Sequence, residues 1–213
     1  MADGAAGSIT PFFTIWTEPR ATIRRIVDTD PRRNVIALAA IGSAIGALSG
    51  QWAKAMGNAA NLSALWPIWV VVVVGVEAAI GVVSLYLGAA VLRWSGGLLG
   101  GVASNLEMRA ALAWSSVPGI TGAIILLTAV LMGVPVPQSA PATLPNIDPS
   151  FYKIMTIEGV LGIWGFIVGL KCIGEVHRFS AWRAFAASLI PAVIVVVSIG
   201  FIIFAFGLLA RHH

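Results

Sequence analysis

Long apolar runs alternate with short polar segments along this 213-residue chain. The run "WPIWVVVVVGVEAAIGVVSLYLGAAVL" starts at Trp66 and holds one charged residue, Glu77. It exceeds the roughly 20 apolar residues that a helix needs to cross a hydrocarbon core of about 30 Å. The pattern predicts an all-α integral membrane protein with five transmembrane helices, over residues 34–52, 65–92, 110–134, 152–172 and 184–208. We expect a cytoplasmic tail over 1–33 and a transmembrane domain over 34–213.

Composition agrees with a bilayer environment. Hydrophobic residues make up 58% of the chain and charged residues 10%, and mean hydropathy is +0.92; soluble proteins carry roughly 25% charged residues. No signal peptide is expected, because the first apolar run begins only at Val35. Cys172 is the one cysteine, which excludes an intramolecular disulfide.

The basic residues predict how the chain is oriented. Basic residues are retained on the cytoplasmic side of a membrane. Ten of the 13 Lys and Arg residues fall in the tail and in the loops after the second and fourth predicted spans, namely Arg20, Arg24, Arg25, Arg32, Arg33, Arg93, Arg109, Lys171, Arg178 and Arg183. The N-terminus is therefore predicted to be cytoplasmic and the C-terminus external. We expect these side chains to meet lipid rather than nucleic acid, since no basic-aromatic binding motif is present.

The tail has a pattern of its own. In "TEPRATIRRIVDTDP", Thr17 is a candidate N-cap and Pro19 lies in the first turn of a short helix. Its apolar residues recur at helical spacing, and its arginines occupy other faces. This indicates either an amphipathic helix lying in the interface or a capped helix that packs under the bundle. In the first case the contacts to anionic lipid head groups, or to a partner protein, come from Arg20, Arg24, Arg25, Arg32 and Arg33.

Two of the predicted spans contain similar stripes of small residues. Each begins at a glutamate and continues on one helical face, as Glu77, Gly81, Ser84, Gly88 and as Glu158, Gly162, Gly165, Gly169. Each is followed by a basic loop and by a similar segment, "RAALAWSSVP" and then "RAFAASLIP". We interpret this as a parallel duplication of a two-helix unit. Small residues on both faces predict that spans 65–92 and 152–172 approach each other closely.

The two glutamates are the candidate ion or proton sites. A charged carboxylate in hydrocarbon costs several kcal/mol, so Glu77 and Glu158 are expected to be protonated, paired or in contact with water. They can bind a proton or cation, or they can form a structural hydrogen bond between helices; the sequence leaves both open.

In the first span, Gly42, Gly46 and Gly50 form two overlapping GxxxG steps, which predict helix packing within the chain or in a homodimer.

Catalytic chemistry has little support in the sequence. No metal-ligand set, phosphate-binding loop or nucleophile–base pair is present, and no cofactor is implied. His177, in "GEVHRF", is interpreted as an interfacial hydrogen bonder.

Several segments together have the character of a known family, namely "IWTEPRATIRRIVDTDP", Gly96–Gly97, "RAALAWSSVP" and especially "GLKCIGEVHRFSAWRAF". Through these segments the chain resembles bacterial members of the Yip (Ypt-interacting protein) domain family. The resemblance implies a five-helix membrane domain with a cytoplasmic N-terminus, here in the bacterial cytoplasmic (inner) membrane. Eukaryotic relatives bind prenylated Rab-type GTPases, but this chain lacks their long cytoplasmic N-terminal region, so that role is not carried over.

Two functions follow from the sequence. The first is a non-enzymatic membrane adapter or organiser that presents its arginine-rich face to lipid or to a partner protein. The alternative is a small channel or transporter that uses Glu77 and Glu158.

Overall fold

The computed structural model describes residues 11–57, 65–134 and 149–209, and every regular element in them is a helix. This confirms the predicted all-α class. A short helix over residues 11–17 precedes α2 (Pro19–Thr29), α3 (Val35–Gly57), α4 (Trp66–Leu98), α5 (Asn105–Ser115), α6 (Val117–Leu131), α7 (Pro149–Val176) and α8 (Ala181–Leu209).

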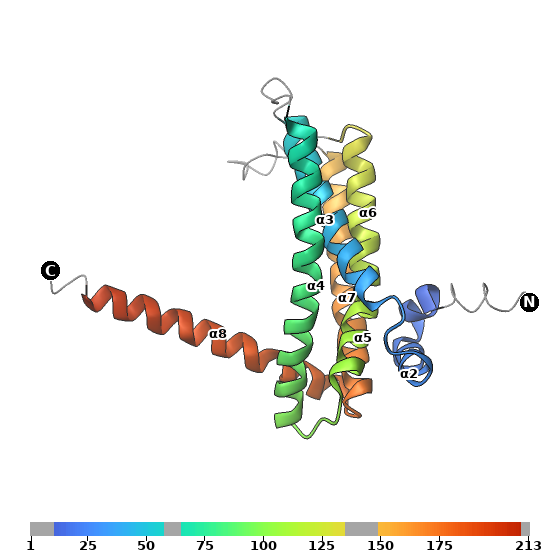
Figure 1. Cartoon of the computed structure of the whole chain (residues 1–213), viewed down its shortest axis with the longest axis vertical. Helices are drawn as coiled ribbons and strands as arrows, with labels where there is room; N and C mark the ends of the chain where they lie inside the picture. The colour runs from blue at the N-terminus through green and yellow to red at the C-terminus, as the bar shows by residue number, and fades with distance from the viewer. Residues whose placement is uncertain (1–10, 58–64, 135–148, 210–213) are drawn as a thin grey trace, which may run out of the picture.

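Helices α3, α4, α6 and α7 stand side by side as an elongated bundle (Figure 1). In the described part of the chain, four helical segments are long and apolar enough to cross a membrane, namely Trp66–Leu98, Asn105–Leu131, Pro149–Val176 and Ala181–Ile199. The apolar part of α3, Val35–Gly50, is shorter. The protein is thus an integral membrane protein.

The predicted span 110–134 is two helices rather than one. Ser104 begins α5 with a capping box, in which its side chain accepts from the Glu107 backbone N–H and the Glu107 side chain accepts from the Ser104 N–H. The helix therefore starts before Arg109. It ends at Ser115, and α6 follows with Pro118 in its first turn, where the missing proline N–H costs least.

The N-terminal helix also begins differently from the prediction. The N-cap of α2 is Glu18 rather than Thr17, and its side chain makes no capping hydrogen bond. Pro19 then occupies the first helical position, where its fixed φ suits the helix. The helix ends at Thr29, in the "DTDP" segment.

The densely packed core lies at the lower end of the bundle in Figure 1, around α2, α5 and the adjoining ends of α4 and α7. Its large members come from segments far apart in sequence and include Ile15, Ile23, Met108, Trp114, Ile173 and Val176. Trp114 is fully buried, packs against Phe12 in a tilted arrangement with ring centroids 4.8 Å apart, and donates from Nε1 to the Arg33 carbonyl at 3.1 Å. The tail is therefore part of this core.

Helix α8 leaves the lower end of the bundle sideways and does not run alongside the other helices (Figure 1). Its first turns pack on α4 and α7, with Ala184 and Ala187 fully buried. Beyond Pro191, which lies inside the helix, Val193 and Val196 are more than half exposed. The segment predicted as a fifth span, 184–208, is helical and apolar, but in this structure it is not packed as a member of the bundle.

The predicted contact between the two stripe-bearing helices is not found. Helices α4 and α7 run in the same direction, as the parallel arrangement requires (Figure 1), but α4 packs mainly on α3, and α7 packs on α6, α5 and α8. The prediction of a close α4–α7 approach was wrong because α3 packs on α4, and α5 and α6 pack on α7. Ser43 of α3, for example, lies directly against Gly81.

Candidate functional site: the basic end of the bundle

Helix α2 is held to the end of α7 by two arginines that share one carboxylate. Arg20 Nη1 lies 3.3 Å from Glu175 Oε2, and Arg24 Nε donates to Glu175 Oε1 at 3.1 Å. Arg24 Nη2 also donates to the Glu175 carbonyl at 2.9 Å. On its opposite face α2 buries Ile23 and Ile26. This is the packing under the bundle that the second interpretation of the tail described.

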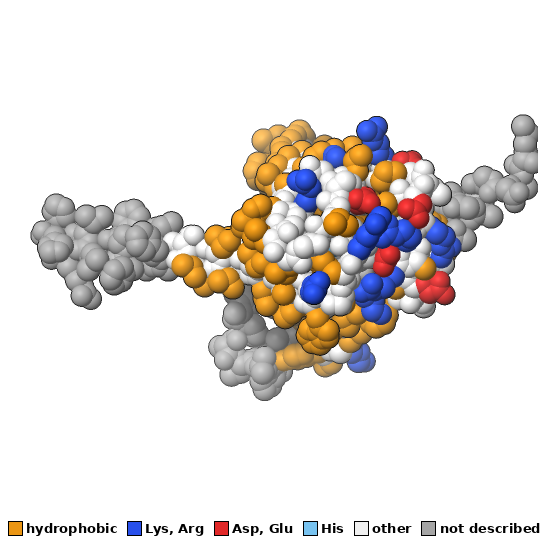
Figure 2. Space-filling model, turned by 90° about the horizontal axis from the view of Figure 1, so that it is seen from below, with side chains coloured by type: hydrophobic (Ala, Val, Ile, Leu, Met, Phe, Trp, Pro, Cys, Tyr) orange, Lys and Arg blue, Asp and Glu red, His pale blue; other side chains and the backbone are white. Residues whose placement is uncertain are grey.

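A polar cleft of about 930 Å³ opens beside these ion pairs. It is lined by Arg20, Arg24, Asp28, Glu175, Arg178, Phe179 and Ser180. Figure 2, which views the molecule from below, shows basic and acidic side chains interspersed on this end, with apolar side chains around them. Three arginines and two acids line the cleft, so much of its positive charge is already balanced within the protein.

The remaining tail arginines differ in their surroundings. Arg25 Nη2 is 3.8 Å from Glu18 Oε2, and both side chains are well exposed. Arg32 is exposed and lines a smaller cavity of about 250 Å³ together with Arg109 and Tyr86. Arg109 is half-buried, and its Cζ lies 4.5 Å from the centroid of the Tyr86 ring. No acidic residue lines this cavity.

His177 fastens the segment after α4 to the end of α7. Its Nε2 lies 3.3 Å from the Leu92 carbonyl, and the Ala103 N–H donates to its Nδ1 at 3.4 Å. Both bonds are satisfied by the neutral tautomer with the proton on Nε2. A Cβ at Gly96 or Gly101 would collide with the imidazole ring. Glycine is therefore required at these two positions, and the prediction that His177 is an interfacial hydrogen bonder agrees with this geometry.

The electrostatic setting of His177 favours the uncharged ring. Burial lowers the pKa of His177, chiefly because a charged imidazolium would lose its hydration. The bond to Leu92 and the charge of Glu107 act in the opposite direction, and Arg93 adds to the lowering.

The predicted glycine stripes occupy several helix interfaces. An added Cβ at Gly42 would lie 3.1 Å from Ile120 Cγ1, whereas Gly88, Gly165 and Gly169 make ordinary contacts of 3.5 to 3.8 Å. Among the described atoms nothing lies within 4 Å of a Cβ at Gly46, Gly50 or Gly162. Gly42 and Gly81 are thus the tightest of the stripe positions.

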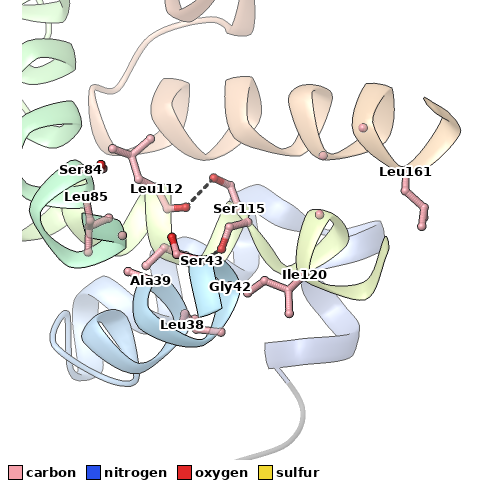
Figure 3. Close-up of a pocket in the computed structure, with 16 residues that line it drawn as sticks. Leu38, Ala39, Gly42, Ser43, Ser84, Leu85, Leu112, Ser115, Ile120 and Leu161 are labelled. Atoms are coloured by element: carbon pink, nitrogen blue, oxygen red, sulfur yellow. Dashed lines mark hydrogen bonds between the residues drawn. The ribbon is translucent and has the colours of Figure 1, made fainter. Parts of the chain in front are cut away.

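A cavity of about 530 Å³ lies between the first turns of α3, the middle of α4 and of α7, and the junction of α5 with α6 (Figure 3). The predicted residues Gly42, Gly81, Ser84, Gly162 and Gly165 all line it. The structure thus brings both stripes to one cavity, although the helices that carry them barely touch. Further lining residues are Ser43, Ser115, Leu112 and Ile120.

Glu77 and Glu158 belong to different helix interfaces. Glu158 lies against α6, because a Cβ at Gly122 would meet its Oε2 at 2.7 Å. Its Oε1 is buried and has no hydrogen-bond partner. Glu77 is half-buried on α4, which packs mainly on α3. The structure therefore does not bring the two carboxyls together across an α4–α7 contact.

Sequence reasoning left Arg109, Arg178 and Tyr86 out of its candidate residues. The sequence did contain signals that could have identified these residues. Arg109 and Arg178 had been counted as cytoplasmic loop charges, and tyrosine is enriched at membrane interfaces. In the described ranges no group of three or more His, Cys, Asp or Glu residues is arranged to hold a metal ion.

Comparison with known proteins places the chain in a family. No curated protein and no solved structure matches it. The model of the Yip1 domain matches residues 13–203, which include the tail, the bundle and most of α8. Members of this family are generally not enzymes. The match spans nearly the whole sequence and includes every segment on which the resemblance rested, and the chain therefore belongs to the Yip1 domain family.

Proposed function

We propose that this protein is a non-enzymatic membrane organiser whose basic end binds anionic lipid head groups and presents a docking face to partner proteins. The observation that supports this most is the gathering of basic residues from the tail, from α5 and from the α7–α8 turn at one end of an apolar bundle. A polybasic surface beside a membrane attracts anionic lipid, at about 1 kcal/mol per Lys or Arg near the surface.

The same surface supports an orientation. The basic end faces the cytoplasm, with the N-terminus inside, in accordance with the retention of basic residues on that side. We propose five spans in the bacterial inner membrane. Helix α3 supports the additional span, because 23 residues extend roughly 34 Å at 1.5 Å per residue, close to the hydrocarbon thickness.

The lipid preference is testable on the full chain. The protein is reconstituted in nanodiscs of phosphatidylcholine with increasing phosphatidylglycerol, and its thermal stability and retained lipids are measured. We expect stabilisation by the anionic lipid that weakens with salt, because exposed charges are screened. Equal stability in neutral and anionic nanodiscs at low salt would refute lipid binding by the basic end.

A transporter is the second candidate, and the orphaned Glu158 Oε1 favours it. An intramembrane carboxyl without a partner is a candidate site for a proton or cation. Flux across liposomes is compared between wild type, Glu158→Gln and Glu77→Gln. Wild-type proton or cation flux that either substitution abolishes would support transport, whereas no flux from the wild type would count against it.

A further inference from the structure

The cavity around Tyr86 lies at a definite depth in the membrane. Trp66 and Tyr86 belong to the same helix, α4, and are separated by 20 residues, which corresponds to roughly 30 Å along a helix axis. That length equals the thickness of a hydrocarbon core. Trp and Tyr are enriched at the two boundaries of the core. With Trp66 at the outer boundary, Tyr86 lies near the inner boundary of the core, where the head-group region begins.

Two guanidinium groups meet at this level from different elements. Arg32 lies in the turn before α3, and Arg109 lies on α5; both line the 250 Å³ cavity with Tyr86. Arg109 is held in place by Tyr86, over whose ring it stacks, and by its Nε, which donates to the Asn105 carbonyl at 3.1 Å. These contacts orient the guanidinium and leave its two terminal nitrogens to donate to a ligand.

No carboxylate lies in the lining of this cavity. Neither Arg32 nor Arg109 forms an ion pair with a carboxylate in the described part of the chain. The nearby Asp30 carboxylate accepts from the Arg32 backbone N–H at 2.9 Å and so closes the local turn. Glu107 accepts from the Ser104 N–H at 2.7 Å in the capping box of α5. Arg20 and Arg24, by contrast, both bind Glu175.

The walls of the cavity are apolar on the side of the bundle. Pro31, Val35, Ile36 and Leu106 complete the lining. Ile36 is 55% exposed, and Val83, one turn above Tyr86 on α4, is 57% exposed. A ligand here therefore meets two cations at one end and an apolar helix surface at the other, which matches a phosphate head group joined to acyl chains. Arginine suits phosphate because its planar fork donates two hydrogen bonds at once.

We propose that Arg32, Arg109 and Tyr86 form a specific site for the phosphate of an inner-leaflet anionic phospholipid, whose acyl chains lie along α3 and α4. The proposal rests on the proposed lipid binding of the basic end and assigns it to these residues rather than to the arginines of α2.

The test uses the full chain in phosphatidylcholine nanodiscs and measures retention of phosphatidylglycerol by native mass spectrometry. Because each basic residue near the surface is worth about 1 kcal/mol, Arg32→Gln and Arg109→Gln should each weaken retention about five-fold and the double variant about 30-fold. Lys153→Gln, which removes an exposed basic residue at the opposite end of α7, is the matched control and should change retention little. Arg109→Lys keeps the charge but loses the planar fork, so its retention of the lipid should fall between those of the wild type and Arg109→Gln.

The outcomes separate this proposal from the broader one. Anionic-lipid preference that survives in the Arg32→Gln/Arg109→Gln variant would overturn the site while leaving the lipid-binding function in place. No preference in the wild type would overturn both. Thermal stability in pure phosphatidylcholine shows whether each variant is folded. Inorganic phosphate added to detergent-solubilised protein should give no comparable stabilisation; stabilisation equal to that by the lipid would indicate a free-phosphate site instead.

Discussion

The α3–α4 interface makes the sharpest prediction about stability, and it concerns Gly81. A Cβ at Gly81 would overlap Ser43 Oγ and would lie 2.6 Å from Ser43 Cβ and 2.7 Å from the Ala39 carbonyl oxygen. The serine hydroxyl can rotate away, but a backbone oxygen and a Cβ cannot. Gly81→Ala must therefore push α3 away from α4, along the interface with the most extensive contact in the bundle.

The size of the effect follows from a comparison within the same helix. At Gly75 nothing lies within 4 Å of an added Cβ, so Gly75→Ala measures the change in helix propensity alone, about 1 kcal/mol in favour of alanine in soluble helices. Gly81→Ala gains the same propensity but pays for overpacking, which costs about 1–3 kcal/mol. We expect Gly81→Ala to be less stable than Gly75→Ala by about 1–3 kcal/mol.

The assay is unfolding of purified protein in mixed micelles, followed by circular dichroism. Ser43→Gly should restore part of the stability of Gly81→Ala, because it removes both colliding atoms of Ser43 and leaves only the Ala39 carbonyl. Equal stability of Gly81→Ala and Gly75→Ala would show that α3 and α4 are not packed through Gly81 and would refute this reasoning.

Three further predictions concern the basic end and α8. Glu175→Gln removes the carboxylate shared by Arg20 and Arg24 and should destabilise the protein by about 1–2 kcal/mol at low salt, because charge-assisted hydrogen bonds are worth more than neutral ones but these groups are partly exposed. Limited proteolysis should then cleave the tail of this variant faster than that of the wild type. An unchanged cleavage rate would contradict the docking of α2. Because burial lowers the pKa of His177, the folded protein takes up this proton at lower pH than the unfolded chain does. Stability should be highest above the unfolded value of about 6.5 and should fall as the pH drops below it, whereas His177→Asn should lack this component in thermal scans from pH 7.5 to 5.5. A helix that is apolar on all sides is stable only when it is buried in protein or lipid, so α8 beyond Pro191 should enter the bilayer in vesicles. A cysteine introduced as Val196→Cys in a Cys172→Ala background should therefore resist labelling by a membrane-impermeant maleimide. Rapid labelling would place α8 outside the membrane.

The helical class and the membrane location could be predicted from the sequence because they depend on local properties. A long apolar run, such as the one that begins at Trp66, must form a helix in lipid, where every backbone group has to be bonded within the segment. The clustering of basic residues at one end of the bundle was also predictable, because counting charges in the loops requires no knowledge of tertiary contacts. The end of the tail helix followed from "DTDP" alone.

Which surfaces meet was decided by the tertiary structure. The spacing of small residues around Gly81 identified a face that packs, but spacing on one helix carries no information about the partner, and α3 rather than α7 covers Gly81. In the sequence, Arg20 and Arg32 are equivalent, since both are arginines of the same short tail. The fold places Glu175, 155 residues away, beside Arg20, and places Arg109 at the same cavity as Arg32. One arginine thereby becomes part of an ion pair and the other keeps its charge for a ligand, because long-range packing determines where the opposite charges lie.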